Sequence, residues 1–142
     1  MTKTKPTLKA QIQRKWHLVD VKDKVLGRKA TEIANLLRGK NKAYFVYNLD
    51  CGDYVVVVNA KDVQLTGKKE TQKTYKRFSG YPSGLSVETA ASLRARRPEE
   101  VIRRAVAGML PKNKLKPIFL TRLYISAGSE HQYQDKFKNN AK

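Results

Sequence analysis

The spacing of apolar residues along the chain predicts strands and helices in alternation. Almost continuously apolar segments at 16–21 and 54–58 predict strands, and the second reads as a strand covered on both faces. Shorter apolar runs predict further strands at 44–47, 63–65 and 122–126. Strands separated by helical segments are typical of an α/β domain with a mostly parallel sheet.

Two longer segments have apolar residues at helical spacing. The first opens at Gly27 and ends before Gly39, a usual C-terminal stop, and its apolar face comprises Ala30, Ile33, Ala34 and Leu37. Three of its cations, Arg28, Lys29 and Arg38, lie off that stripe, so we expect them to face solvent or a ligand. Short helices are also predicted at 87–93 and 115–121.

The second long helix opens at Pro98, which suits a first helical position, and is followed by two acids at the positive helix end. Its buried stripe is predicted to comprise Val101, Ile102, Ala105, Val106 and Met109. Pro111 ends the pattern, and the exposed sequence Lys112-Asn113-Lys114 follows. Between the predicted strand at 63–65 and the helix at 87–93, residues 66–84 have no core pattern and predict a basic loop.

Length and patterning together predict a single compact three-layer α/β domain, with a small, mostly parallel sheet flanked by helices. The chain has 142 residues, 40% of them hydrophobic, which suffices for one core. We divide it into a basic N-terminal arm (1–15), the α/β domain (16–133) and a basic C-terminal tail (134–142), expected to be mobile in isolation. No apolar run is long enough to span a membrane, and we expect no secretory signal.

Charge narrows the choice of partner. Thirty Lys and Arg against twelve Asp and Glu give a formal charge of +18, with a pI near 10.2. Self-repulsion at this net charge destabilises a compact state unless a polyanion neutralises it. A single cysteine, Cys51, excludes an intrachain disulfide and a cysteine-rich zinc site, and is expected to be a small buried hydrophobe.

Neither nucleotide binding nor catalysis has a clear signature. Thr66-Gly67-Lys68-Lys69 is similar to the end of a phosphate-binding loop, but Asp62 stands where that loop needs glycine. Asp50 and Asp53 lack further ligands at metal spacing, and Asp53 reads better as a turn or amide-capping residue. No sequence signature of a catalytic nucleophile accompanies His17 or His131. We therefore expect no enzyme activity, no cofactor, no metal and no small-molecule substrate.

The cations cluster in two regions that favour RNA. In the first, Lys68, Lys69, Lys73, Lys76 and Arg77 surround Tyr75 and Phe78, which suits phosphate neutralisation with base stacking. In the second, few acids interleave with the bases Arg94, Arg96, Arg97, Arg103, Arg104, Lys112, Lys114 and Lys116. A merely solvated helix face would pair its bases with acids four residues away, so counterion release to a phosphate backbone is the favoured explanation.

A series of short motifs resembles the bacterial-type large-subunit ribosomal protein thirteen family, the universal L-thirteen family. The motifs span about residues 14–131 and comprise Arg14-Lys15-Trp16, Leu26-Gly27-Arg28-Lys29-Ala30-Thr31, Leu37-Arg38-Gly39-Lys40, Gly52-Asp53-Tyr54-Val55, Val58-Asn59-Ala60, Leu65-Thr66-Gly67-Lys68-Lys69, Arg96-Arg97-Pro98-Glu99 and the stretch from Ala105-Val106 through Asn113. The family's histidine pair near the C-terminus is reduced here to His131 alone.

The resemblance implies a structural protein that binds 23S-type rRNA of the large subunit early in assembly, beside neighbouring ribosomal proteins. The contacts it implies are Arg38, Gly39, Lys40, Thr66, Gly67, Lys68, Lys69, Tyr75, Arg96, Arg97, Lys112 and Asn113. We add further predicted RNA contacts at Arg14, Lys15, Trp16, Arg28, Lys42, Lys73, Lys76, Arg77, Arg103, Arg104, Lys114 and His131. A cytoplasmic ribosome is expected, and an organellar one stays open.

Two alternatives remain at this point. One is a nuclease that uses Asp50 and Asp53 with a divalent ion. The other is a general binder of polyanions, with DNA or an acidic membrane surface as its target.

Overall fold

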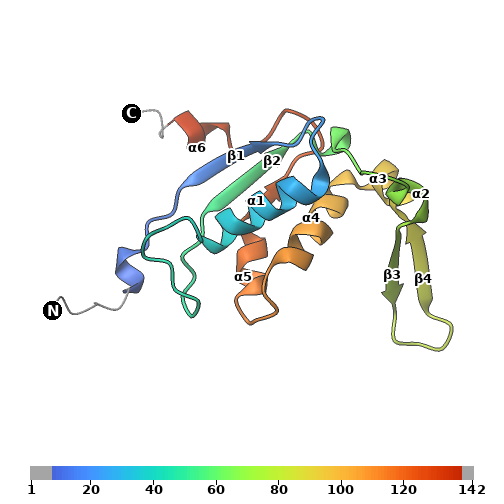
Figure 1. The fold of residues 1–142 in the computed structure, drawn as a ribbon, viewed down its shortest axis with the longest axis horizontal. Coiled ribbons are helices and arrows are strands. Elements are labelled where there is room, and N and C mark those ends of the chain that lie inside the picture. Colours follow the sequence, from blue (N-terminus) through green and yellow to red (C-terminus); the bar gives the residue numbers. More distant parts are fainter. Residues whose placement is uncertain (1–7, 139–142) are drawn as a thin grey trace.

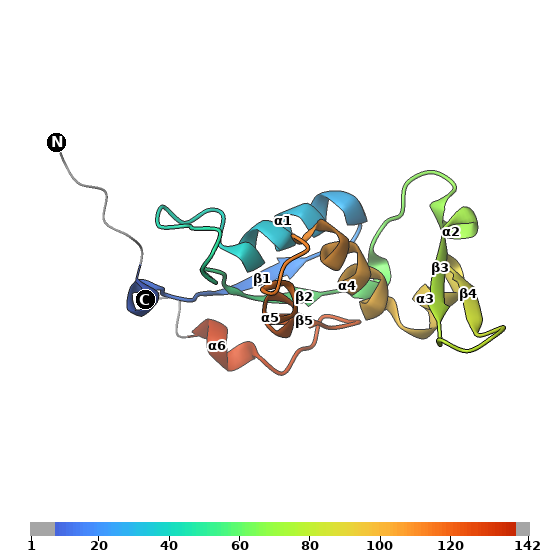
Figure 2. The same ribbon diagram turned by 90° about the horizontal axis from the view of Figure 1, so that it is seen from below.

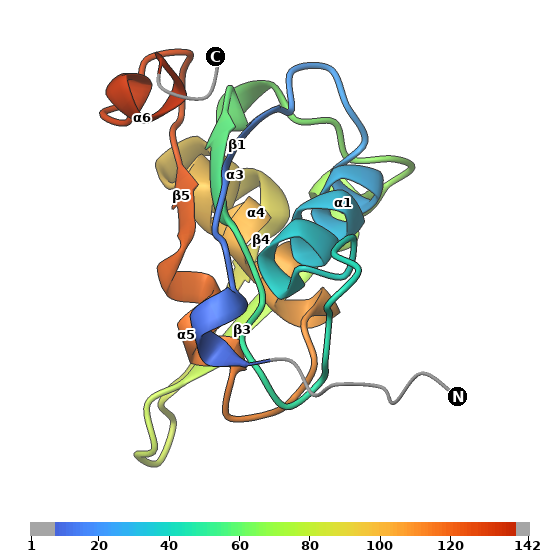
Figure 3. The same ribbon diagram turned by 90° about the vertical axis from the view of Figure 1, so that its left-hand side faces the viewer.

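A computed structural model describes residues 8–138 and contains a three-stranded parallel sheet. The strands are β1 (Trp16–Asp20), β2 (Tyr54–Val58) and β5 (Leu123–Ile125), in the order β1-β2-β5, as Figure 3 shows. Trp16 is opposite Tyr54, and Val55 is opposite Leu123. The small parallel sheet and the α/β class are as predicted.

Two helices, α1 (Leu26–Arg38) and α4 (Pro98–Met109), pack against each other on one face of this sheet. Each step from β1 to β2 and from β2 to β5 moves the chain in the same direction, so crossovers of constant hand place both helices on one face. The core lies between them and includes Val19, Val57, Ile33 and Val106.

The opposite face of the sheet is covered by aromatic side chains and the C-terminal segment. Trp16 stacks on Tyr54, with centroids 4.5 Å apart, and also on Tyr124 and Tyr133. Helix α6 (Gln134–Lys138) adds Phe137 to the edge of Trp16. Figure 2 shows α1 and α6 on opposite sides of the sheet. The sequence did not predict this helix in the basic tail.

Residues 66–97, which we call the hairpin unit, extend from one end of the molecule. They contain the short helix α2 (Lys69–Gln72), strands β3 (Thr74–Phe78) and β4 (Leu85–Thr89) in an antiparallel hairpin, and α3 (Ala90–Arg96). Figure 1 shows β3 and β4 at the opposite end of the molecule from the N-terminal segment. The prediction of a loop over 66–84 is therefore wrong. β3 and β4 pair locally as a hairpin, and neither strand has a buried apolar stripe that would mark it in the sequence.

Several other predictions of local structure need correction. Residues 44–47 form no strand, since Tyr44 and Tyr47 lie in turns and the two residues between them are irregular, and 63–65 contribute a single bridge between Val25 and Gln64. The helix predicted at 87–93 begins at Ala90, because the preceding residues pair in β4. Met109 is 41% exposed and not buried, since α4 ends there and its last turn leaves the core.

The remaining elements agree with the sequence or are short. Helix α5 (Lys116–Thr121) falls within the predicted 115–121, and two 3-10 turns occupy η1 (Lys9–Gln11) and η2 (Ala60–Asp62). Cys51 is buried, as expected. Within residues 8–138, no helix has the length and apolar character needed to cross a membrane.

Candidate RNA interface

Asp53 connects three cationic or donor groups at the amino end of the sheet. Its carboxylate accepts hydrogen bonds from the backbone N–H of Lys15 at 2.9 Å and from Lys42 Nζ at 2.5 Å, and lies 3.0 Å from His17 Nε2. Burial alone would raise the pKa of Asp53, but these hydrogen bonds outweigh it and hold the pKa below its ordinary value. The predicted amide-capping role is confirmed.

Asp50 binds a second set of cations beside it. The two terminal guanidinium nitrogens of the buried Arg122, Nη1 and Nη2, donate to its carboxylate, and Arg14 Nη1 lies 3.1 Å from it. Burial raises the pKa of Asp50, and the bonds and charges of Arg122 and Arg14 lower it by more. We call Asp50, Asp53, Arg14, His17, Lys42 and Arg122 the ionic cluster.

The ionic cluster contradicts the nuclease alternative. The oxygens that a divalent ion would need on Asp50 and Asp53 already accept hydrogen bonds from fixed cations. Across residues 8–138, no group of three or more His, Cys, Asp or Glu is placed to hold a metal. These carboxylates therefore fix the start of the sheet and the residues that precede it.

Some residues predicted to contact RNA are engaged within the protein at this end. Lys42 also donates to the backbone carbonyl of Gln13 at 2.6 Å, and the Arg38 guanidinium lies over the Phe45 ring. Gly39 ends α1 with φ +74°, and a Cβ there would overlap the carbonyl of Cys51. Trp16 stacks on the rings of Tyr54, Tyr124 and Tyr133 on the outer side of the sheet.

A groove between α1, α4 and the start of the hairpin unit brings together cations from distant parts of the sequence. This cavity of about 350 Å³ is lined by Thr66, Lys69, Lys73 and Arg104 together with apolar residues of both helices. No carboxylate lines it, but Arg104 Nε lies 3.7 Å from Glu100 four residues earlier in α4, so this base does have the acid partner that the sequence pattern was expected to lack. We call this cavity the basic groove, and its charge suits a phosphate backbone.

The Tyr75 ring lies beside the groove, in contact with two of its cations. Lys73 Nζ lies 5.5 Å and the Arg104 guanidinium 5.0 Å from the ring centroid. The ring packs against the core, and burial raises the pKa of Tyr75 despite the nearby Arg104. Tyr75 therefore orders Lys73 and Arg104, and its partial burial leaves little of its ring for base stacking.

The hairpin unit carries far more positive charge than its own acids neutralise. Residues 66–97 contain eight Lys and Arg and two Glu. Glu70 pairs with Arg94 and Glu88 with Arg96, each at 2.8 Å. Among residues 8–138, no carboxylate lies within 4 Å of Lys68, Lys69, Lys73, Lys76, Arg77 or Arg97. Two of these six cations, Lys69 and Lys73, line the basic groove, and the other four belong to the same hairpin unit.

Other predicted contacts lie outside the groove. Arg28 is exposed on α1, and Lys40 is exposed just after that helix. Lys112, Asn113 and Lys114 form an exposed turn between α4 and α5, in which Asn113 Oδ1 accepts a hydrogen bond from the N–H of Leu115. Gly67 shapes the turn before α2 with φ +66°.

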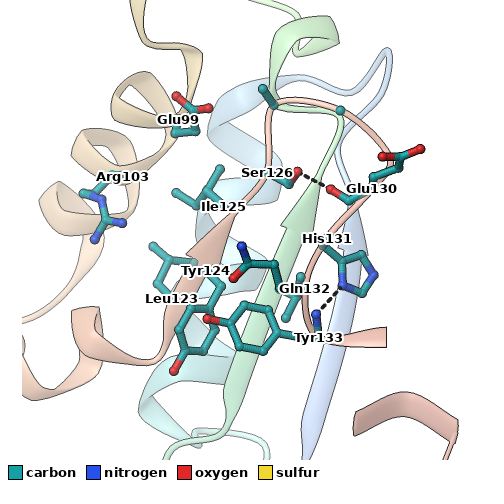
Figure 4. A pocket seen from close by; sticks show the side chains of 13 residues that line it. Glu99, Arg103, Leu123, Tyr124, Ile125, Ser126, Glu130, His131, Gln132 and Tyr133 are labelled. Atoms are coloured by element: carbon teal, nitrogen blue, oxygen red, sulfur yellow. Dashed lines mark hydrogen bonds between the residues drawn. The ribbon is translucent and has the colours of Figure 1, made fainter. Parts of the chain in front are cut away.

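Arg103 and His131 line a different cavity, at the β5 edge of the sheet. It has a volume of about 580 Å³, and Figure 4 shows Arg103 and Glu99 of α4 across from Tyr124 of β5 and His131. Glu130 lines it as well. Two carboxylates in one lining oppose a polyanion, so this larger cavity suits RNA less well than the basic groove does.

Sequence reasoning missed the exposure of Tyr47 and Tyr81, and it did not foresee which partners several cations would have within the protein. Tyr81, in the hairpin turn, is 76% exposed, and its position in a Gly/Pro-rich segment beside Lys76 and Arg77 was the available signal. The ion pairs of Lys42 and Arg14 gave no sequence signal, because their partners are 11 and 36 residues away.

Comparison with known proteins shows the family of this chain. Residues 14–132 match the family model described as ribosomal protein L13. The chain is 51% identical to large ribosomal subunit protein uL13 of Nostoc sp. over 94% of this chain and 88% of that protein. It is 52% identical to the protein of the same name from Citrifermentans bemidjiense, over 92% of each.

The relative from Geobacillus kaustophilus, also named large ribosomal subunit protein uL13, is 52% identical over 87% of this chain and 86% of its own length. The family match covers most of the chain, and so does the alignment to each of these relatives. The chain therefore belongs to the ribosomal protein L13 family, whose members are structural proteins and not enzymes.

Proposed function

We propose that this protein is a structural constituent of the large ribosomal subunit that binds 23S-type rRNA and supports early assembly of the subunit. The observation that carries the proposal is the basic groove, where Lys69, Lys73 and Arg104 line one cavity without a carboxylate. The relatives named as large ribosomal subunit proteins support rRNA of that subunit as the partner. Its place of work is the cytoplasmic ribosome.

Phosphate contacts start from the groove and continue over the hairpin unit. The unpaired cations Lys68, Lys76, Arg77 and Arg97 extend the positive surface beyond the cavity. The exposed cations Arg28, Lys40, Lys112 and Lys114 provide contacts on other sides of the molecule, which suits a protein that joins separate rRNA segments. Such contacts position the protein and do not read base sequence.

The arm and tail serve the same purpose in this proposal. The end of the arm (1–15) is attached to the α/β domain (16–133) through the ion pair of Arg14 with Asp50 and the hydrogen bond from the N–H of Lys15 to Asp53. The tail (134–142) packs on Trp16 through Phe137, and its last residues lie outside the described part. Neighbouring large-subunit proteins contact the surfaces that rRNA leaves free.

The test compares RNA binding by groove and control variants over a range of salt. Lys69→Ala, Lys73→Ala and Arg104→Ala combined remove three groove cations. We expect weaker binding to large-subunit rRNA and a log–log salt slope shallower by about 2 to 2.7, since each phosphate contact contributes about 0.7–0.9. The control, Lys22→Ala with Lys24→Ala, removes two exposed lysines that are not among the predicted contacts, and should leave the slope near that of the wild type.

An unchanged slope in a folded groove variant would reject the groove as the RNA site. Equal competition by duplex DNA, or equal binding to anionic vesicles, would instead favour the general polyanion binder. Purified wild-type protein that fails to bind large-subunit rRNA would reject the proposed function itself.

A further inference from the structure

The two faces of the β3–β4 hairpin differ sharply in composition. Directly opposed residues of antiparallel strands share a face. One face holds the pairs Tyr75–Glu88 and Arg77–Ser86. The other, which we call the outer face, holds Phe78–Leu85, Lys76–Val87 and Thr74–Thr89. Tyr75, on the first face, packs against the core.

The outer face leaves large apolar side chains in solvent. Phe78 is 66% exposed, Leu85 56% and Val87 52%, and Tyr81 in the adjoining turn is 76% exposed. A two-stranded hairpin gains little stability from apolar groups that pack on nothing. A contiguous exposed apolar patch on a part of the molecule that extends from the body indicates a partner surface.

The turn that carries Tyr81 is well defined. The N–H of Ser79 donates to the Gly84 carbonyl at 3.1 Å, and the N–H of Gly84 donates to the Tyr81 carbonyl at 3.0 Å. Gly80 and Ser83 adopt positive φ to close it. The Tyr81 ring is therefore presented from a hydrogen-bonded turn, so less entropy is lost when a partner orders it.

Charge indicates the class of partner. The outer face has no carboxylate, and the single acid of the two strands, Glu88, lies on the other face and pairs with Arg96. Lys76 stands within the outer face, and Arg77 follows it in β3 without an acidic neighbour among the described residues. Exposed rings interleaved with unpaired cations suit RNA whose bases are unstacked.

We propose that the outer face of the hairpin, with Tyr81, is a stacking platform for unpaired bases of the bound rRNA. Phe78 and Tyr81 present ring faces to two bases, Leu85 and Val87 support the apolar contact, and Lys76 neutralises the neighbouring phosphate. The platform rests on the proposed function and adds a contact that differs in kind from the phosphate contacts of the groove.

The experiment separates stacking from charge through the salt dependence of binding. Phe78→Leu with Tyr81→Leu keeps apolar side chains and removes both aromatic faces. We expect affinity for large-subunit rRNA to fall about tenfold or more, with an unchanged log–log salt slope. Lys76→Ala with Arg77→Ala should lower affinity and also make the slope shallower by about 1.4 to 1.8.

A spectroscopic measurement reports the stacking directly. The Phe78→Trp variant adds a second indole to Trp16, which stacks inside the aromatic layer. We expect rRNA to quench the emission of this variant by a larger fraction than that of the wild type. Equal fractional quenching would count against base stacking at position 78.

One result would overturn the platform while leaving the proposed function intact: the folded variant Phe78→Leu with Tyr81→Leu binds naked rRNA as tightly as the wild type. If this variant also enters reconstituted large subunits poorly, the outer face would be assigned to a protein neighbour. Failure of the wild type to bind rRNA would count against the proposed function and not the platform alone.

Discussion

The ionic cluster and the hairpin unit are both rich in Lys and Arg, but they use these residues in opposite ways. In the cluster, Arg122 is buried beside the carboxylate of Asp50, and Lys42, with 13% of its side chain exposed, pairs with Asp53. In the hairpin unit, Lys68, Lys76 and Arg77 have no carboxylate within 4 Å among residues 8–138. The formal charge of +18 therefore combines cations that hold the fold with cations available to a partner.

The apolar residues near the two regions also differ: those beside the ionic cluster are buried, and those of the hairpin are exposed. β2 is almost wholly buried, whereas β3 and β4 expose Phe78, Leu85 and Val87. Removing a group from the cluster should therefore affect stability, while removing one from the hairpin should affect binding. Four predictions test this contrast, from the largest expected effect to the smallest.

The largest effect is expected where the chain passes closest to itself beside the cluster. A Cβ on Gly52 would overlap the backbone carbonyl of Leu37, so Gly52→Ala must displace α1 or the start of β2. We expect it to lose about 4 kcal/mol or more of stability, or to fail to fold cooperatively, in urea unfolding followed by circular dichroism.

Gly108→Ala is the matched control for this change. The Cβ would meet nothing within 4 Å in the last turn of α4. We expect this variant to be more stable by about 0.5–1 kcal/mol, since alanine favours a helix. Equal changes in the free energy of unfolding for the two substitutions would contradict the close approach of Gly52 to the Leu37 carbonyl.

The next largest effect is expected from breaking the cluster itself. Asp53→Ala leaves the largely covered Lys42 without its partner and removes the acceptor for the N–H of Lys15. We expect a loss of about 3–5 kcal/mol in the free energy of unfolding. Glu32→Ala, which breaks an exposed pair with Lys29, should change stability by less than about 0.5 kcal/mol.

Acid should weaken the same region. The pKa values of Asp50 and Asp53 are lower in the folded state than their ordinary value of 3.8. The unfolded chain therefore takes up protons first as pH falls, so their contribution is complete above the unfolded pKa and is lost as pH passes down through the folded values.

Urea unfolding between about pH 6 and pH 2 measures this loss. Asp50→Asn with Asp53→Asn should show a shallower decline below about pH 4 than the wild type, although it starts from a lower stability. Parallel declines would mean that other carboxylates control acid unfolding.

The smallest effect on stability is expected in the hairpin. Phe78→Ser and Val87→Thr change side chains that are already more than half exposed. We expect the free energy of unfolding to change by no more than about 0.5 kcal/mol for each, measured in the same urea titration. A loss of 2 kcal/mol or more would show that the outer face supports the fold and would remove the contrast between the two regions.

The elements with a clear apolar pattern were predictable from the sequence, and those without one were not. The pattern located α1 and α4, β2 and the glycine at the end of α1, because burial on one face imposes a period that sequence displays. The β3–β4 hairpin lacks a buried stripe, so its segment read as a loop. Helix α6 was missed for a related reason, since Phe137 is its main anchor on the sheet.

For the candidate site, the sequence predicted which residues contact RNA, and the structure shows that some of these residues are engaged within the protein. The excess of cations and the family resemblance indicated RNA, and Thr66, Lys69, Lys73 and Arg104 do line one cavity. Lys42, Arg14 and Trp16 were assigned to RNA on the same grounds, but the structure places them in ion pairs or stacked rings. Tyr75, chosen as a stacking ring, is half-buried between two cations.

By itself, the sequence determined the fold class, the net charge, the long helices and the family, because each is a property of composition or of local periodicity. Only the tertiary structure decided which cations are neutralised and which rings are exposed. Those outcomes depend on contacts between residues far apart in the chain, such as Asp50 with Arg122, and on which face of a hairpin packs against the body. Pairing over that distance leaves no period in the sequence.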